Sequence, residues 1–460
     1  MASLHIAEPT RDIPVIAEVD VLVVGGGPAG VAAAIGAARA GARTMIVERH
    51  GFLGGMWTAG MVLTLAGFNS WLRPYRRCVA GVGGEWVERA ELQGGARFDD
   101  GFVINSDPEV MKRVADDLMS EAGVTLMLHT WGATPIMDGS RVTGAFIENV
   151  DGRGAILAGS TIDATGNGDF IARSGATWVK ADDLQPMTMS FRLAGATPDL
   201  TIPHGVPTLL PIGPEAGTLH DPILTDYSSS RRDVAVNAAD MAAAAARGEL
   251  PRYGGPWFGG LERDIVWVNT TRVVGDASVA SDLTRAEVEG RRDTRRIVDY
   301  FVKSVPAFAN ATLVQTSTQI GVRETRRLVG ELVMTGDDVR SARRFDDSIA
   351  VGCWPIDVHP TQKQVGTHSM FVPEPFDISY RVLVPREVDG LLATGRCASL
   401  DRDALGSMRV GATCAAMGQA AGVAAAVAVS AGVKLRDVDV AVVQAQLRSQ
   451  KAIVNVDDVR

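Results

Sequence analysis

The chain has 460 residues, enough for two or three domains, and 46% of them are hydrophobic, as in ordinary globular enzymes. The net charge is −9 and basic residues form only short clusters, which disfavours nucleic-acid binding. The four cysteines lie far apart in the sequence, which predicts no metal site and favours reduced thiols in a cytoplasmic protein. At the start of the chain, residues 1–13 lack the apolar core of a signal peptide.

A strand, a glycine turn and a helix follow one another over residues 19–39. The valine-rich segment 19–24 predicts a strand, and it runs directly into the turn 25–30 and an alanine-rich helix. A second strand, over residues 44–47, ends at Glu48. This order is the layout of a dinucleotide site, although an ordinary strand-to-helix turn without a ligand shares parts of it.

Each polar or glycine position of this layout has a physical role. Gly25 permits the tight turn, Gly27 lets the backbone approach a pyrophosphate, and Gly30 lets the helix pack closely on the strand. The helix N-terminus then faces the phosphates with free N–H groups. Glu48 is expected to accept hydrogen bonds from both hydroxyls of a ribose.

The next segments extend the same domain. The glycine-rich loop 51–60 needs a partner to hold it, and a bound flavin would do so. Residues 108–122 predict an amphipathic helix, and residues 124–129 and 142–147 predict strands of a meander with a turn at 138–139. A further strand runs into the tight polar turn 163–169.

From residue 185 to about residue 385 the pattern changes to that of a separate α+β domain. Strand-like pieces (187–193, 265–269, 311–319) alternate with long helical ones (230–247, 284–304). The chain then returns to a strand at 390–394 and an alanine-rich helix at 412–433, which we expect to be buried and not to span a membrane. We therefore predict a first domain at 1–180, a substrate or cap domain at 181–385, a return segment at 386–432 and a helical tail at 433–460.

Several of these segments together resemble one family. They are the turn 25–30 with Glu48, the loops 51–60 and 163–169, and residues 394–396 with 406–411. With the stretches 321–327 and 355–359, they resemble the FAD-dependent oxidoreductases of the two-dinucleotide-binding-domain flavoproteins, closest to a bacterial branch labelled simply by that activity. The resemblance implies an α/β fold, in which a Rossmann-like FAD-binding domain of the glutathione-reductase type is interrupted by an α+β cap.

The resemblance also implies FAD contacts by position. The pyrophosphate would lie against the glycine turn, the adenosine against the end of the second strand, and the flavin against the glycine-rich loop and the return segment. The implied residues are Gly25, Gly27, Pro28, Ala29, Gly30, Glu48, Arg49, Gly54, Gly55, Met56, Leu128, Ala164, Thr165, Gly166, Gly395, Arg396, Ser407, Arg409 and Val410. A helix N-terminus at 407–411 would stabilise negative charge on a reduced flavin.

Asp357 and His359 are the leading catalytic candidates. Two residues apart on an extended segment, they would point to one face, and the carboxylate would orient the imidazole as a general base. The alternative is a surface loop with a solvated histidine, and His368 is a second candidate. Arg323 is a candidate clamp for a substrate carboxylate, against a structural role in an ion-pair network with its charged neighbours.

The leading hypothesis is a dehydrogenase or oxidase that moves a hydride from a C–H next to oxygen or nitrogen of a small organic substrate to flavin N5. The sequence has no second strand–glycine–helix element, which argues against an internal NAD(P)H domain. A flavin-dependent monooxygenase that uses external NAD(P)H is the alternative, and a non-catalytic binding protein is the alternative of another class. We expect no nucleic-acid or membrane partner, and leave open the electron acceptor and a homo-oligomer.

Overall fold

A seven-stranded sheet is the base of the molecule, and its order is β6-β2-β1-β9-β8-β7, with β20 also paired to β9. The computed structural model describes residues 6, 9–72, 74–99, 103–197, 236–262, 264–361 and 369–460. The strands of this sheet are β1 (Val15–Val24), β2 (Thr44–Val47), β6 (Thr125–Met127), β7 (Trp131–Asp138), β8 (Arg141–Asn149), β9 (Gly152–Asp163) and β20 (Leu391–Ala393).

Strands β6, β2, β1, β9 and β20 run parallel, and the last four residues of β1 are buried on both faces. This explains the continuous apolar run at 21–24. The meander predicted from the sequence exists, but it consists of β7, β8 and β9. The prediction for residues 124–129 was wrong in its pairing, because β6 pairs with β2 in parallel.

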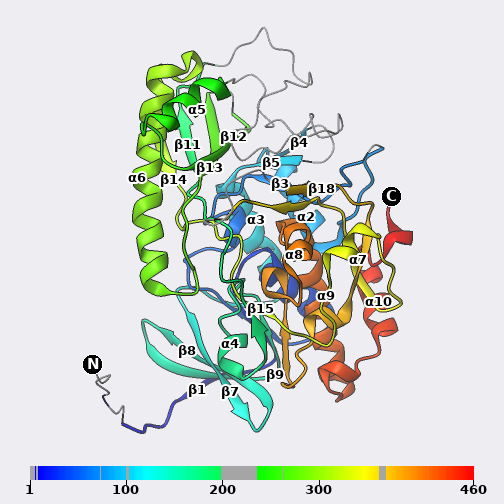
Figure 1. Ribbon diagram of the computed structural model, residues 1–460. Helices are drawn as coiled ribbons and strands as arrows, with labels where there is room; N and C mark the ends of the chain where they lie inside the picture. Colours follow the sequence, from blue (N-terminus) through cyan, green and yellow to red (C-terminus); the bar gives the residue numbers. More distant parts are fainter. Residues whose placement is uncertain are drawn as a thin grey trace.

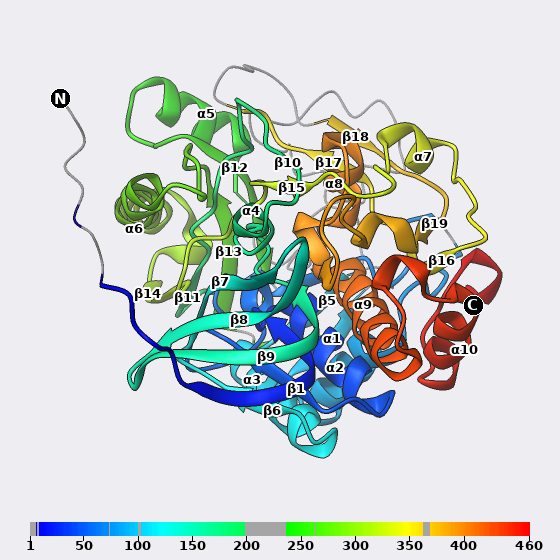
Figure 2. The ribbon, with the colours of Figure 1, turned by 90° about the horizontal axis from the view of Figure 1, so that it is seen from below.

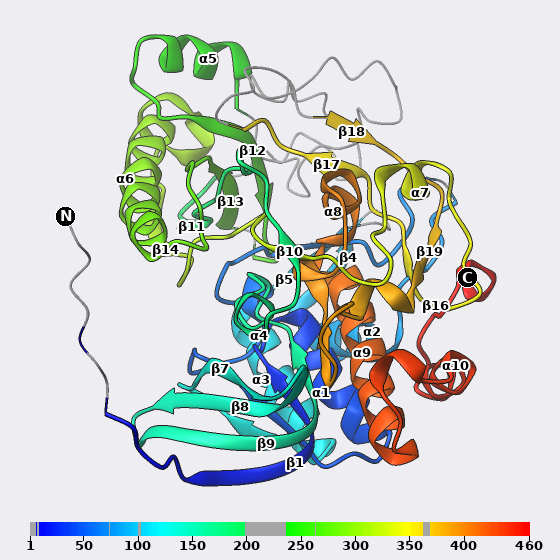
Figure 3. The same ribbon diagram turned by 60° about the horizontal axis from the view of Figure 1, so that its bottom comes forward.

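Two helices of small residues cross in close contact behind this sheet, α1 (Pro28–Arg39) and α9 (Gly411–Ala431), which Figure 3 shows side by side. A Cβ atom at Gly418 would lie 2.0 Å from the carbonyl oxygen of Ala29, and one at Gly422 would lie 1.9 Å from that of Ala33. Helix α9 is long and apolar enough to cross a membrane by composition, yet 83% of its most apolar window is buried inside the fold. The burial predicted for this helix is therefore confirmed.

The other helices cover the edges of the sheet and form the cap and the tail. They are α2 (Gly81–Leu92), α3 (Pro108–Glu121), α4 (Ile171–Ser174), α5 (Ala238–Ala246), α6 (Ala280–Ser304), α7 (Gly336–Arg340), α8 (Arg402–Met408) and α10 (Val440–Ser449). Helices α3 and α6 match the predicted helical segments 108–122 and 284–304. The first residues of the predicted helix 230–247 lie outside the described residues, and α5 forms its second half.

The cap stands on one side of the molecule, where α6 (green) packs along a four-stranded sheet (Figure 1). The order of that sheet is β12-β13-β11-β14, with β11 (Phe191–Ala194), β12 (Tyr253–Gly259), β13 (Ile265–Thr271) and β14 (Thr312–Thr316). It has an apolar core of its own, in which Phe191, Phe258, Phe301 and Phe308 are fully buried. Most of the buried apolar residues within 334–356 and 376–384, by contrast, contribute to the main core with α8 and α9.

Smaller sheets lie around the main sheet and the cap sheet, and the view from below shows β16 and β19 on the side away from α6 (Figure 2). They are β3 (Thr64–Ala66) with β5 (Val103–Ser106) and β4 (Ala96–Asp99), β10 (Trp178–Val179) with β15 (Arg327–Leu328), β16 (Ser348–Gly352) with β19 (Phe376–Ser379), and β17 (Ile356–Val358) with β18 (Ser369–Phe371). The chain reaches the cap after β9 and comes back at β20, which pairs with the last three residues of β9. Residues of the cap and of the return segment are thereby brought to the carboxyl ends of β1 and β9.

Candidate functional site

A cavity of about 360 Å³ opens where β1 ends and extends to the cap sheet. This volume is within the range of small-molecule sites in proteins, roughly 300–1,000 Å³. All but four of the predicted cofactor residues line it, and so do Asp357, His359 and Arg323. The parallel strands thus carry the site at their carboxyl ends, where open α/β sheets hold their ligands.

The glycine turn forms the floor at one end of the cavity. Gly25 has φ +104°, and a Cβ atom there would lie 2.7 Å from the carbonyl oxygen of Ala164. A Cβ atom at Gly30 would lie 1.7 Å from the carbonyl oxygen of Gly25, so that helix α1 packs directly on the turn. Gly30 itself therefore does not line the cavity.

The N-termini of two helices open on the cavity. Pro28 and Ala29 of α1 line it, and so do Val410 and Gly411 at the start of α9. Neither helix has a side-chain hydrogen bond at its N-cap or an acidic residue in its first turn. Unsatisfied N–H groups and the helix dipoles make both ends suitable for anions such as a pyrophosphate.

Glu48 follows β2 and is 7% exposed. Its Oε2 accepts a hydrogen bond from the Gly26 N–H at 2.5 Å, and its Oε1 accepts one from the His50 N–H at 2.9 Å. The carboxylate is therefore held rigidly on the cavity wall. Each oxygen keeps a lone pair for a further donor, so the group fits the hydroxyls of a ribose.

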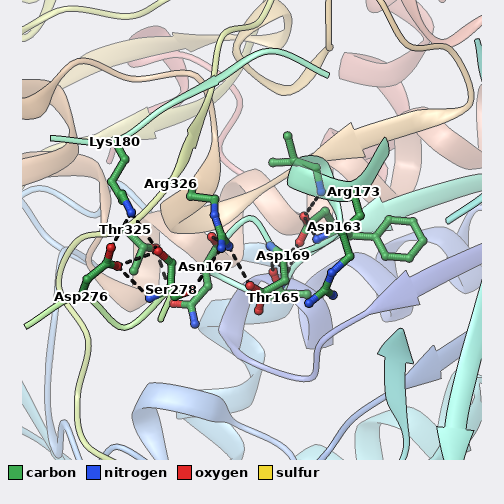
Figure 4. A network of polar contacts seen from close by, with 12 residues as sticks. Asp163, Thr165, Asn167, Asp169, Arg173, Lys180, Asp276, Ser278, Thr325 and Arg326 are labelled. Carbon is green, nitrogen blue, oxygen red and sulfur yellow. Dashed lines mark hydrogen bonds and ion pairs between the residues drawn. The ribbon is translucent and has the colours of Figure 1, made fainter. Parts of the chain in front are cut away.

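The turn after β9 is held by a buried carboxylate (Figure 4). Oδ1 of Asp163 accepts hydrogen bonds from the N–H and hydroxyl of Thr165, and Oδ2 accepts from the N–H groups of Phe170 and Ile171. Burial raises the pKa of Asp163. These bonds fix the conformation of the loop whose residues 164–167 line the cavity.

Arg396 supplies a half-buried positive charge to the same wall. Its Nη1 donates to Thr325 Oγ1 at 3.1 Å and its Nη2 to Asn167 Oδ1 at 2.9 Å. Burial lowers the pKa of Arg396 to about 10. Within the described part of the chain no carboxylate pairs with it. A half-buried cation that lines a cavity together with two helix N-termini fits a bound anion.

The other end of the cavity is an aromatic chamber under the cap sheet. We use this name for the part of the wall formed by Trp257, Phe258, Trp267 and Trp354, together with Thr188, Ser190 and Asn269. Strands β12 and β13 present most of these side chains, and Thr188 and Ser190 lie just before β11. The chamber therefore combines a large apolar surface with a few hydroxyl and amide groups, as small-molecule sites do.

Asp357 and His359 lie on the wall of this chamber. Nε2 of His359 lies 3.4 Å from Oδ1 of Asp357, so the two side chains share one face, as the spacing predicts. Nη2 of Arg409 lies 3.5 Å from Oδ2 of Asp357 and donates to its carbonyl oxygen at 2.7 Å. The ring of Trp257 stands at 83° to the imidazole, with the ring centres 6.1 Å apart.

The arginines of the stretch 321–327 have different surroundings. Arg323 lines the cavity, and its Nη1 donates to Pro186 O at 2.5 Å and to Thr188 Oγ1 at 2.7 Å. Arg326 pairs with Asp169 at 2.8 Å (Figure 4), and Arg327 forms a buried ion pair with Glu324 at 2.8 Å. Arg326 and Arg327 thus have the structural role in ion pairs that was the alternative for this stretch. Of the three arginines, Arg323 is the one that lines the cavity.

Three predicted cofactor residues besides Gly30 lie behind the wall. Gly54 donates its N–H to Gly26 O, and Leu128 precedes the lining residues 130–132. Ser407 lies in the last turn of α8 and donates to Trp354 O at 2.5 Å. The helix N-terminus predicted at 407–411 begins at Gly411. His368 lies outside the described residues.

Some residues of the cavity wall were not predicted from the sequence. Thr130, Trp131 and Gly132 line the cavity beside Glu48, and Asn167 and Gln319 also line it. Trp131 begins β7, a strand that the sequence pattern did not indicate. Gln319 follows β14 of the cap, 271 residues from Glu48, so only the fold brings the two together. Among the described residues, no group of three acidic, histidine or cysteine side chains is placed to hold a metal.

A family model and two curated relatives match this chain. The family model described as "FAD dependent oxidoreductase" matches residues 20–447. The chain is 29% identical over 183 residues to a digeranylgeranylglycerophospholipid reductase of Methanospirillum hungatei, over 37% of this chain and 42% of that protein. It is 53% identical over 45 residues to a thiamine thiazole synthase of Methanococcus vannielii, over 10% of this chain and 17% of that protein. The matched regions thus span less than half of either curated relative.

Among solved structures, a geranylgeranyl bacteriochlorophyll reductase-like protein from Thermoplasma acidophilum aligns over 95% of this chain and 83% of its own. Its sequence is 14% identical and the TM-score is 0.49.

Proposed function

The chain belongs to the FAD-dependent oxidoreductase family, and from this premise we propose that it is a dehydrogenase or oxidase of a small organic substrate. It is an enzyme, and its cofactor is FAD. The fold supports this assignment, because a Rossmann-like sheet presents a glycine turn and two helix N-termini to one cavity. When bound, FAD supplies an acceptor for a hydride from the substrate.

The residues of the cavity fit the two ends of this cofactor. Glu48 is held for a ribose, and the first turns of α1 and α9 are open to phosphate oxygens. Arg396 adds a half-buried positive charge whose described partners are a hydroxyl and an amide. The aromatic chamber then remains for the substrate, between this cradle and the cap.

One observation carries the proposed reaction: His359 and Asp357 lie together on the chamber wall. The imidazole would take the proton of a substrate hydroxyl or amine as the hydride leaves the neighbouring carbon. Asp357 would orient the imidazole and stabilise its charged form, while Arg409 fixes the carboxylate from the other side. Arg323, held by Thr188, would orient a polar group of the substrate.

The test is substrate-dependent reduction of the holoenzyme without oxygen. Purified yellow protein is mixed anaerobically with a panel of alcohols and amines, including aromatic ones, and its visible spectrum is followed. We expect at least one compound to bleach the flavin absorbance, and that compound to be oxidised at the carbon next to oxygen or nitrogen. If none does so while NADPH bleaches it at once, the proposed reaction is wrong.

The aromatic lining favours a second candidate, a flavin-dependent monooxygenase that uses external NAD(P)H. Trp257, Phe258, Trp267 and Trp354 suit an aromatic ring. This candidate predicts that an aromatic compound stimulates NAD(P)H oxidation and gains an oxygen atom. The same spectroscopic screen, repeated with NADPH in air, separates the two candidates.

The four free thiols support the proposed cytoplasmic location.

A further inference from the structure

Gln319 of the cap lies against the segment that follows the ribose-binding acid. It comes three residues after β14, and its main-chain N–H donates to the carbonyl oxygen of Ala59 at 3.1 Å. Ala59 belongs to the glycine-rich loop of the first domain. The cap is therefore bonded to that loop by its main chain at this point, and the Gln319 side chain lines the cavity.

The side chain makes a second connection. Oε1 of Gln319 accepts a hydrogen bond from Nη2 of Arg49 and lies 2.8 Å from Nε2 of His50. An amide oxygen only accepts, so His50 carries its proton on Nε2 in this arrangement. One oxygen atom of the cap is thus shared by two neighbouring side chains of the first domain.

These two side chains directly follow Glu48 in the sequence. The main-chain N–H of His50 donates to Oε1 of Glu48, so hydrogen bonds run from Gln319 through His50 to the acid. Arg49 is also held from the other side, because its guanidinium lies 5.2 Å from the ring centre of Trp131. Trp131 is 54% exposed and lines the same end of the cavity.

We propose that Gln319 is a positioning residue that latches the cap over the adenosine end of the FAD site and so slows release of the cofactor. The cavity wall beside Gln319 includes Glu48, Arg49 and His50, and Ala59 directly precedes Gly60, which also lines the cavity. FAD leaving past the ribose acid would have to part the cap from residues 49–50. The proposal concerns cofactor retention, and it holds whichever of the two candidate reactions the enzyme catalyses.

The proposal makes the acceptor oxygen the critical atom. Gln319→Met keeps the length of the side chain and removes the oxygen, while Gln319→Glu keeps an acceptor that bonds arginine and histidine more strongly. Gln315→Ala is the matched control, because Gln315 lies in β14, the strand that Gln319 follows, and does not line the cavity. Each variant is purified as the holoenzyme, and its apoprotein is checked by thermal unfolding.

The measurement is the rate of FAD release, followed by the fluorescence of free FAD after dilution, together with the rate of rebinding. We expect Gln319→Met to release FAD about tenfold faster or more, with little change in the rebinding rate. Gln319→Glu and Gln315→Ala should release it no faster than the wild type. Release from Gln319→Met at the wild-type rate would overturn the proposal, and so would equal acceleration in the Met and Glu variants.

A double-mutant cycle with His50 gives a second test, and its single variant His50→Asn is also measured alone, in case Gln319→Met is poorly stable. His50→Asn removes the imidazole donor from the other side of the contact. If the latch exists, the combined variant with Gln319→Met should release FAD more slowly than the product of the two single effects predicts. If the release rate of the double variant equals the product of the two single fold-changes, Gln319 and His50 do not share a contact that retains FAD.

Discussion

Nε2 of His359 lies 3.4 Å from Oδ1 of Asp357, while the other oxygen of that carboxylate faces Arg409 at 3.5 Å. The carboxylate therefore stands between an arginine, which is always charged, and an imidazole, which takes up and gives off a proton near neutral pH. This arrangement gives the imidazole a fixed orientation. It also places the negative charge where a protonated His359 would need it.

Replacing His359 with Gln should slow substrate-dependent flavin reduction by about 10²- to 10⁴-fold, because the general base is lost. Asp357→Asn should slow it less, by about tenfold to a hundredfold, because the imidazole remains but loses its orienting charge. The rates are measured by anaerobic stopped-flow spectroscopy at saturating substrate. Both variants should keep their full FAD content, and a wild-type rate in His359→Gln would exclude this residue as the base.

Arg396→Gln should change cofactor affinity and apoprotein stability in opposite directions. The affinity for FAD should fall by about tenfold to a hundredfold, since a charge-assisted contact to an anion is lost. The apoprotein should be as stable as the wild type or more so, because a half-buried charge that no described carboxylate pairs with is removed.

The readouts for this variant are FAD titration of the apoprotein and thermal unfolding of the same sample. Arg153→Gln is the control, because Arg153 pairs with Glu148 at 2.8 Å and does not line the cavity. It should leave both quantities nearly unchanged. An unaltered FAD affinity in Arg396→Gln would show that the Arg396 guanidinium does not contact the cofactor.

The end of the site at β1 could be predicted from the sequence because its parts are local. The strand, the turn at Gly25 and the start of α1 are adjacent in the chain, and sterics alone require glycine at the turn. The spacing of Asp357 and His359 likewise fixes a shared face on an extended segment. In each case the prediction rests on the geometry of a few neighbouring residues.

The rest of the wall depends on contacts between distant segments. Trp131 reaches the cavity because β6 pairs with β2 in parallel, and no local pattern indicates that pairing. Ser407 was predicted at a helix N-terminus, but the chain forms two helices there, and the break falls between Met408 and Gly411. Gln319 lies beside Arg49 only because the cap folds back over the first domain.

Gly418→Ala should loosen the crossing of α1 and α9. A Cβ atom there would lie 2.0 Å from the carbonyl oxygen of Ala29, and backbone on both sides cannot move aside freely. We expect a loss of about 1–3 kcal/mol in the free energy of unfolding. FAD affinity should also fall, because Ala29 belongs to the first turn of α1 that lines the cavity.

Gly84→Ala in α2 is the matched control for this substitution. The one close approach of its Cβ atom would be to the end of the Arg77 side chain, at 2.9 Å, and that side chain can shift. Helix propensity then predicts a stability equal to the wild type or higher by up to about 1 kcal/mol. Urea unfolding of both variants measures the difference, and equal stabilities would contradict the close contact at Gly418.

Asp293 on α6 should make the protein less stable as the pH rises. Asp293 is 8% exposed. Burial, and next the negative charge of Glu289, raise the pKa of its carboxyl to about 6, whereas the pKa in the unfolded chain is about 3.9. Between these two values the native state binds more protons than the unfolded state, so the free energy of unfolding falls as pH increases through the window. Asp293→Asn removes the titration, and should therefore stabilise the protein by up to about 3 kcal/mol at pH 8 and by only about 1 kcal/mol near pH 4.5. Urea unfolding at the two pH values tests this prediction. Asp299→Asn, on the exposed face of the same helix, is the control. If the stability gained in Asp293→Asn does not grow with pH, the pKa of Asp293 is not raised by burial.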